Sequence, residues 1–106
     1  MDWLPATEQF IHEQVKIETK NMSAAQLRIW ECVAVAPEKW VIKRDDDLAG
    51  NYWVVAIFGR SVVWYNDIEE GFDVSLYSIF GEIDEYFASQ FELRHIMEQI
   101  IERISG

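Results

Sequence analysis

Two β-branched and aromatic segments, Tyr52–Phe58 and Ser61–Asn66, constrain this chain more than any other feature. Only Gly59-Arg60 separates them. Apolar segments joined by two residues, with glycine first, are typical of a β-hairpin closed by a type II′ turn. The turn fixes the register, because the strand residues pair outward from it. The sequence therefore predicts a hairpin over residues 52–66.

The register of the hairpin predicts which side chains lie opposite one another. Counted outward from the turn, the expected pairs are Phe58 with Ser61, Ile57 with Val62, Ala56 with Val63, Val55 with Trp64, Val54 with Tyr65, and Trp53 with Asn66. Both faces of the first strand are apolar in this register. Such a strand is typical of a sheet interior, so we expect it to be covered at least in part on both sides.

Helices are predicted on both sides of the hairpin. The first runs from about Pro5 to Lys20, because proline suits the first helical turn. The second, over about 24–34, follows a capping box at Ser23–Gln26. A strand is the alternative there, because Leu27, Ile29, Val33 and Val35 also alternate.

The C-terminal segment carries the strongest helical pattern. A second capping box at Ser89–Glu92 precedes apolar residues at helical spacing, namely Leu93, Ile96, Met97, Ile100, Ile101 and Ile104. The sequence predicts a last helix that begins near Ser89.

The remaining segments complete a sheet. Trp40–Ile42 is predicted as a short strand, and Arg44–Asn51 as a loop. Phe72–Leu76 alternates like a strand with one solvated face, while residues 78–88 fit a strand or a helix. The fold class is therefore α+β: an antiparallel meander of three or four strands, with two N-terminal helices and one C-terminal helix. At 106 residues, half of them hydrophobic, we expect a single domain over 1–106.

The negative charge is unevenly distributed. The chain has 19 acidic and 9 basic residues, for a net charge of −10, and residues 61–93 hold eight acids and no Lys or Arg. Such a field attracts cationic partners and disfavours direct binding to nucleic acid or to an anionic membrane. The single cysteine and an N-terminus without signal-peptide features predict a cytoplasmic location.

No residue set predicts a metal site or a catalytic centre. The acidic segment 66–73 has the composition of a calcium loop, but Ile68 and Tyr77 occupy positions that require ligands. Glu92 and His95 form one Glu-x-x-His pair, where di-iron sites need two and further glutamates. Cys32 has no suitably spaced partner, and we expect it to be a small buried residue. We therefore expect no cofactor and favour a non-enzymatic protein.

The acidic segment beside aromatic residues predicts a protein-binding surface. Tyrosine and tryptophan are enriched at interfaces, and carboxylates attract Lys and Arg. The expected contact residues for a basic partner, in an immunity- or inhibitor-like role, are Trp64, Tyr65, Asp67, Glu69, Glu70 and Asp73. The alternative is a small-molecule or enzymatic pocket between sheet and helices, lined by Trp53, Trp64 and Tyr65. An uncovered sheet face or edge would also allow the chain to form a homo-oligomer.

One segment carries a resemblance. At Trp64-Tyr-Asn-Asp-Ile-Glu-Glu-Gly-Phe72, and less clearly at Pro37–Trp40, the chain resembles small uncharacterised bacterial proteins. The likeness covers about residues 30–93. It implies a bacterial origin, and no activity comes with it.

Overall fold

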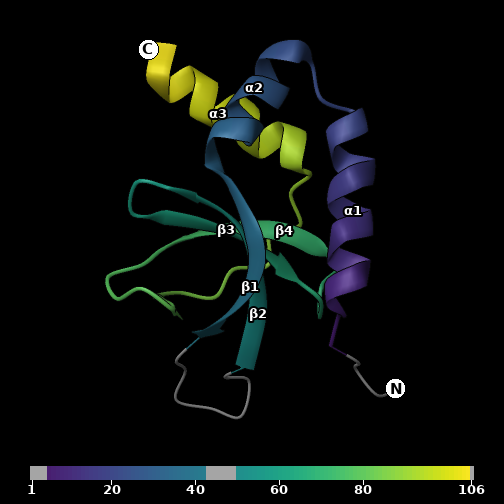
Figure 1. Cartoon of the computed structure of the whole chain (residues 1–106). Helices are drawn as coiled ribbons and strands as arrows, with labels where there is room; N and C mark the ends of the chain where they lie inside the picture. Colours follow the sequence, from purple (N-terminus) through teal and green to yellow (C-terminus); the bar gives the residue numbers. More distant parts are fainter. Residues whose placement is uncertain (1–4, 43–49, 106) are drawn as a thin grey trace.

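The computed structural model describes residues 5–42 and 50–105. Within these residues, three helices and five strands follow one another; Figure 1 shows their arrangement. They are α1 (Glu8–Lys20), α2 (Ala24–Val33), β1 (Ala34–Ile42), β2 (Gly50–Phe58), β3 (Ser61–Asn66), β4 (Gly71–Leu76), β5 (Glu82–Ile83) and α3 (Leu93–Ser105). The α+β class, with two N-terminal helices and one C-terminal helix, is confirmed.

The five strands form one sheet in the order β4-β3-β2-β1-β5. The first four make the expected antiparallel meander, but β5 runs parallel to β1, with Val41 beside Glu82 and Ile42 beside Ile83. The prediction of three or four strands, all antiparallel, was therefore wrong. The difference arises in the undecided segment 78–88, which is mostly irregular and contributes only the two residues of β5.

The sheet curls until its outer strands approach each other. Asp84, which follows β5, donates its backbone N–H to the carbonyl of Leu76 at the end of β4, at 3.0 Å. At the start of β4, Phe72 and Phe91 exchange two backbone hydrogen bonds of 3.1 and 2.8 Å. The outer edge of β4 is thus engaged near both ends, which protects it from pairing with another chain.

Apolar clusters lie on both faces of the sheet. The first core lies between the sheet and the helices, and its members include Ile11, Trp30, Val55, Ala56, Val63, Tyr65, Phe72, Leu93, Ile96, Met97 and Ile100. The second core lies on the other face, with Trp40, Ile42, Tyr52, Val54, Val62, Trp64 and Ile83, and Tyr77 and Tyr86 pack against it. The expectation that β2 is an interior strand covered on both sides is confirmed.

The β2–β3 hairpin keeps its predicted register only near the turn. The pairs from Phe58–Ser61 to Ala56–Val63 are confirmed, and Gly59 has a φ of +59°, as the first position of a type II′ turn requires. Beyond them a bulge shifts the register, so that Val54 pairs with Trp64 rather than with Tyr65.

The bulge changes which side chains share a face. Val55 and Ala56 both pack in the first core, and Trp53 packs against that core while Val54 lies in the second. The predicted pairs of Val55 with Trp64 and Trp53 with Asn66 were wrong for the same reason. An inserted residue cannot be inferred from period-two alternation when both faces of the strand are apolar.

The two N-terminal helices follow their capping residues. Helix α1 begins at Glu8 rather than in the turn of Pro5, because the Thr7 side chain accepts the backbone N–H of Phe10. The capping box of Ser23 and Gln26 is confirmed at the start of α2. Strand β1 begins directly after Val33. Of the alternating residues, Leu27, Ile29 and Val33 therefore lie in α2, and Val35 lies in β1.

Strand β1 is longer than the predicted Trp40–Ile42. It begins at Ala34 and accommodates Pro37, with a register irregularity between Ala34 and Glu38. Proline has no N–H to offer the ladder, which explains the irregularity at that point. The expected loop at 44–51 falls largely on residues 43–49, outside the described residues, and Gly50 already belongs to β2.

Strand β4 has no solvated face of the kind predicted. Asp73 and Ser75 are buried because the segment before α3 packs over them, and the exposed residue is Leu76. Ser89 donates its backbone N–H to Asp73 Oδ1 at 2.7 Å, and the Ser75 hydroxyl donates to the Glu85 carbonyl at 2.7 Å.

Helix α3 begins later than the capping box at Ser89–Glu92 predicted. Gln90 has a φ of +57°, and Phe91 is bonded to β4, so the helix starts at Leu93. Glu18 of α1 accepts the backbone N–H of Leu93 through Oε1, at 2.7 Å. A distant carboxylate therefore caps the helix in place of a local serine.

Candidate functional site

The β3–β4 turn is held by one buried asparagine. Asn66 accepts the backbone N–H groups of Ile68 and Glu69 through Oδ1, each at 3.1 Å. Its Nδ2 donates to the Tyr86 hydroxyl and to the Phe87 carbonyl, each at 3.0 Å. All the hydrogen-bonding capacity of the amide is used. The turn is thereby fixed to the segment that precedes α3.

Gly71 brings this turn into close contact with Gln90. A Cβ atom at Gly71 would lie 2.4 Å from the Cα of Gln90, which leaves room for no side chain. The Gln90 side chain also donates to the Glu69 carbonyl. Glu69 and Glu70 are exposed on the outside of this turn, and Glu70 has a φ of +58°.

A second anchor connects the turn to the segment before α1. Asp67 Oδ2 accepts the backbone N–H of Ala6 at 2.8 Å. Trp53 Nε1 donates to the carbonyl of the same residue, also at 2.8 Å. Ala6 is therefore held from both sides, and the Thr7 cap follows it directly. These bonds place the first turn of α1 against strand β3.

The two anchors create a hollow of about 270 Å³, which we call the acid–aromatic hollow. Its lining residues come from the start of α1 and from the β3–β4 turn: Pro5, Ala6, Thr7, Phe10, Tyr65, Asp67 and Glu70. The rings of Phe10 and Tyr65 have centroids 5.7 Å apart. Two carboxylates and two aromatic rings thus meet in one recess.

The electrostatics of the hollow are negative. Burial raises the pKa of the Tyr65 phenol above its ordinary value, and the charges of Glu70 and Asp67 raise it further. The phenol therefore remains a neutral donor and acceptor across the physiological pH range. The influence of both carboxylates on one hydroxyl indicates that they project a shared negative potential into the hollow.

The structure separates the six residues predicted to contact a partner into two groups. Trp64 and Asp73 have no exposed surface, and Tyr65 is 6% exposed. Asp67 is half-buried, while Glu69 and Glu70 are exposed. Tyr65, Asp67 and Glu70 come together in the acid–aromatic hollow. Trp64 lies instead in the second core, where its Nε1 donates to the Ser75 hydroxyl at 3.0 Å.

The three residues of the alternative pocket are not brought together. Trp53 and Tyr65 face the helices, whereas Trp64 faces the opposite side of the sheet. Trp64 and Tyr65 are neighbours in β3, so their side chains point to opposite faces in any register. The bulge in β2 decides only that Trp53 lies on the side of Tyr65 and not on that of Trp64.

Asp73 is a buried carboxylate whose ionisation lowers stability. Burial raises its pKa, although hydrogen bonds from Ser89 act in the opposite direction, and Oδ2 finds no partner among the described residues. A raised folded pKa means that the folded state binds the proton more tightly. The stabilisation is full below the unfolded pKa of about 4 and is lost as the pH rises through the folded pKa.

Asp73→Asn should therefore remove the loss of stability that ionisation of Asp73 causes. We expect the free energy of unfolding of the variant to exceed that of the wild type at neutral pH and to converge with it near pH 4. Each pH unit by which the folded pKa exceeds the unfolded one corresponds to about 1.4 kcal/mol. Urea titrations over a pH series measure the difference, with Asp84→Asn as the exposed control. Parallel pH profiles for Asp73→Asn and the wild type would contradict the prediction.

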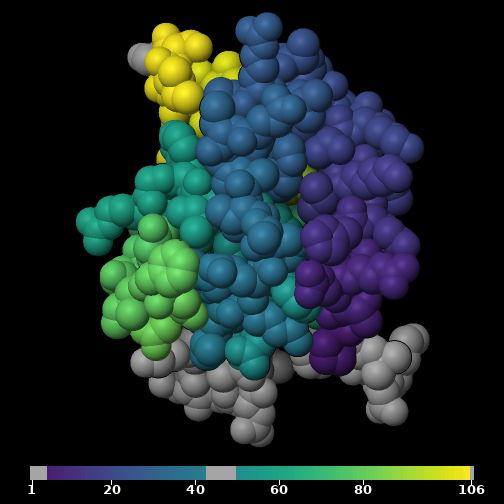
Figure 2. All heavy atoms as spheres, in the orientation of Figure 1, coloured from purple at the N-terminus to yellow at the C-terminus, as the bar shows by residue number. Residues whose placement is uncertain are grey.

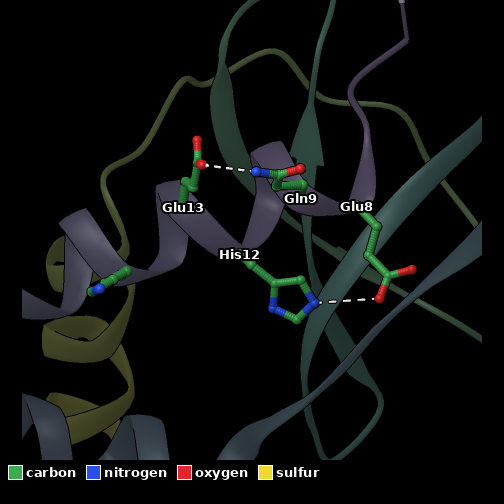
Figure 3. Close-up of a pocket in the computed structure, with 5 residues that line it drawn as sticks. Glu8, Gln9, His12 and Glu13 are labelled. Atoms are coloured by element: carbon green, nitrogen blue, oxygen red, sulfur yellow. Dashed lines mark hydrogen bonds and ion pairs between the residues drawn. The ribbon is translucent and has the colours of Figure 1, made fainter.

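A larger hollow on α1, of about 400 Å³, carries no comparable arrangement (Figure 3). Its lining residues, Glu8, Gln9, His12, Glu13 and Lys16, all belong to one helix face. The drawn contacts join neighbours one turn apart: His12 with Glu8 at 3.3 Å, and Gln9 with Glu13 at 3.4 Å. These exposed pairs support the helix itself, and no second element contributes a group to this surface.

The remaining candidate groups stay apart from one another. In residues 5–42 and 50–105, no three His, Cys, Asp or Glu side chains gather as metal ligands, and no helix there is long and apolar enough to cross a bilayer. Cys32 is exposed rather than buried. Glu92 bonds Arg94 at 2.7 Å and lies 3.9 Å from His95, all on the exposed start of α3.

Comparison with known proteins gives no match. No family model fits the chain, and no curated protein or solved structure is significantly similar to it. The candidate site therefore depends on geometry and charge alone.

Two features of the surface had no clear signal in the sequence. Phe10 lies within the first predicted helix and nothing in the sequence assigns it to a site, yet it lines the acid–aromatic hollow. From the end of β4 onward, Leu76, Ile79 and Phe80 have exposed apolar side chains, and the ring centroids of Phe80 and Trp40 lie 4.7 Å apart. In the space-filling view, this green segment lies at the surface beside β1 (Figure 2).

Proposed function

We propose that this protein is a non-enzymatic binding module that docks a basic protein through the β3–β4 turn. The observation that carries the proposal is the acid–aromatic hollow, in which Asp67 and Glu70 share a recess with the rings of Phe10 and Tyr65. A guanidinium or ammonium group of the partner enters this recess. The exposed Glu69 beside it contributes to the same negative surface.

The chemistry of the hollow suits arginine best. A planar guanidinium can bond a carboxylate and stack on an aromatic ring at the same time. The turn is already held by Asn66, and Ala6 is held by Asp67 and Trp53, so little of the site must be ordered on binding. The net charge of −10 adds long-range attraction, which raises the association rate at low salt. An immunity- or inhibitor-like role fits such a charge-steered surface.

An NMR titration with a triarginine peptide blocked at both ends tests this proposal. The largest chemical-shift changes are expected at Ala6, Phe10, Tyr65 and the 67–70 turn. Phe10→Ala should weaken binding by about threefold to fivefold, because one wall of the cation–π site is lost. Ile17→Ala, another exposed apolar residue of α1 outside the hollow, is the matched control.

Two results would end the proposal. One is peptide binding centred on another acidic surface, such as the exposed acids of α2 and α3. The other is an equal effect of Phe10→Ala and Ile17→Ala, which would mean that the hollow contributes nothing specific.

Other features of this proposal come from the sequence alone. A cytoplasmic location, a bacterial origin and self-association stay predictions. Self-association is favoured by the exposed apolar side chains of Leu76, Ile79 and Phe80. Light scattering over a range of concentrations tests it, and a monomer at every concentration would exclude it.

A further inference from the structure

A second recess, separate from the acid–aromatic hollow, lies between α3 and the sheet. It has a volume of about 440 Å³, and its lining comes from the β2–β3 hairpin, β4, the segment 85–91 and α3. Figure 1 shows the C-terminal half of α3 extending above the hairpin. The apolar lining comprises Phe58, Val63, Val74, Leu76, Phe87, Phe91, Ile96 and Ile100. We call this recess the α3 groove.

The α3 groove arises because the first core closes only around the beginning of α3. Leu93, Ile96 and Met97 are buried, but the last turn carries the exposed Arg103 and Ile104. At that end the helix leaves Val74 half-buried and Leu76 and Phe87 exposed. Eight apolar side chains line the recess beside six polar or charged ones, namely Ser61, Ser75, Glu85, Ser89, Gln99 and Arg103. Recesses of this size that combine apolar and polar groups are common small-molecule sites.

Two unpaired charges of opposite sign lie on different walls of the groove. Arg103 comes from α3 and Glu85 from the segment after β5. Within the described residues neither forms an ion pair, with the other or with any further side chain. A ligand with one negative group is therefore attracted toward Arg103 and repelled from Glu85. The two charges would set the direction of such a ligand in the groove.

We propose that the α3 groove binds an amphipathic monocarboxylate, a small molecule with an alkyl or aromatic body. Its apolar body packs on Val74, Leu76 and Phe87, and its carboxylate pairs with the guanidinium of Arg103. Ligand binding in the α3 groove is independent of the docking of a basic protein at the β3–β4 turn, because the two sites share no lining residue.

An extended peptide is a poorer occupant of the groove. A peptide that adds to a sheet needs a free run of backbone N–H and C=O groups. At one end of the β4 edge, the backbone N–H and C=O of Phe72 are bonded to Phe91. At the other end, the carbonyl of Leu76 accepts the backbone N–H of Asp84. The groove therefore offers side-chain contacts and one cationic group, but no continuous backbone ladder.

The test uses three probes with the same alkyl chain and different head groups. Decanoate, decanol and decylammonium are titrated below their aggregation concentrations, and binding is followed by NMR. We expect decanoate to bind with saturation and to shift the resonances of Val74, Leu76, Phe87 and Phe91. Decanol should bind more weakly. Decylammonium can pair only with Glu85, so its affinity should fall in Glu85→Gln and not in Arg103→Gln. Failure of decanoate to saturate these resonances would overturn the proposal.

Variants separate the head-group contact from the apolar contact. Arg103→Gln should weaken decanoate about threefold and leave decanol unchanged, because only the charged head loses its partner. Arg94→Gln is the matched control, since Arg94 lies on the same helix, pairs with Glu92 and does not line the groove. Glu85→Gln should strengthen decanoate, because a repulsive charge is removed.

A blocking variant tests the groove itself. Gln99 is exposed on α3 and lines the groove, so Gln99→Trp should fill the recess without disturbing the core. We expect at least a tenfold loss of decanoate affinity, with an unchanged circular dichroism spectrum. Equal decanoate affinity in Arg103→Gln, Arg94→Gln and Gln99→Trp would overturn the proposal. Binding in the groove with no preference among the three head groups would refute the assigned role of Arg103.

Discussion

Gly71→Ala is expected to destabilise the protein by about 3 kcal/mol, a large effect for the addition of one methyl group. The new Cβ would lie 2.4 Å from the Cα and 2.8 Å from the Cβ of Gln90. Neither atom is the end of a flexible side chain, so the backbone must move. The neighbouring Phe72–Phe91 hydrogen bonds oppose that movement. Thermal unfolding should show the midpoint lowered by about 10 °C or more.

Gly59→Ala is the control for this prediction. Gly59 has a positive φ, of +59°, and an added Cβ there would meet no atom within 4 Å. Its cost is the left-handed backbone alone, about 1 kcal/mol. Similar destabilisation in the two variants would mean that the contact between the β3–β4 turn and Gln90 is absent. In that case the acid–aromatic hollow would lose its structural support.

Trp64→Ala is expected to cost about 4 kcal/mol, because a large, fully buried side chain is removed from the second core. The Trp64 ring contacts Tyr52 and Tyr86, with centroids 5.1 and 5.7 Å away. Its Nε1 bond to Ser75 would also be lost. Domains of this size are stable by about 5–15 kcal/mol, so the variant should unfold at much lower urea concentration.

This result separates a core residue from an interface residue. Were Trp64 part of a binding surface, its removal would leave unfolding nearly unchanged and would weaken a partner instead. Phe10→Ala is the matched comparison, because Phe10 is 38% exposed and belongs to the proposed site. We expect it to cost about 1 kcal/mol and to weaken arginine binding. Equal stability losses in the two variants would contradict this assignment.

The sequence predicted the elements whose signals are local. The turn of Gly59, the capping box of Ser23 and the apolar stripe of α3 each depend on residues close together in the chain. The bulge in β2 left no such signal, because both faces of the strand are apolar. One extra residue there placed Trp53 on the face of Tyr65 and away from Trp64.

The sequence predicted the acidic residues of the candidate site but not the other side chains that line the hollow. Asp67, Glu69 and Glu70 occupy a turn that composition alone identifies. Asp73 is buried because Ser89, sixteen residues later, returns to bond it. Phe10 reaches the site only because Asp67 holds Ala6. Such long-range contacts have no periodic pattern that could reveal them in one sequence.

Capture of partner proteins from native lysate at low salt tests the proposed function most directly. The baits are the wild type, Glu69→Lys/Glu70→Lys, and the control Glu31→Lys/Glu102→Lys. The control makes the same change in net charge on α2 and α3, which extend to the opposite end of the molecule from the start of α1 (Figure 1). We predict basic proteins that bind the wild type and the control and are lost from Glu69→Lys/Glu70→Lys. Retention of the same proteins by all three baits would contradict the assignment of the β3–β4 turn as the docking surface.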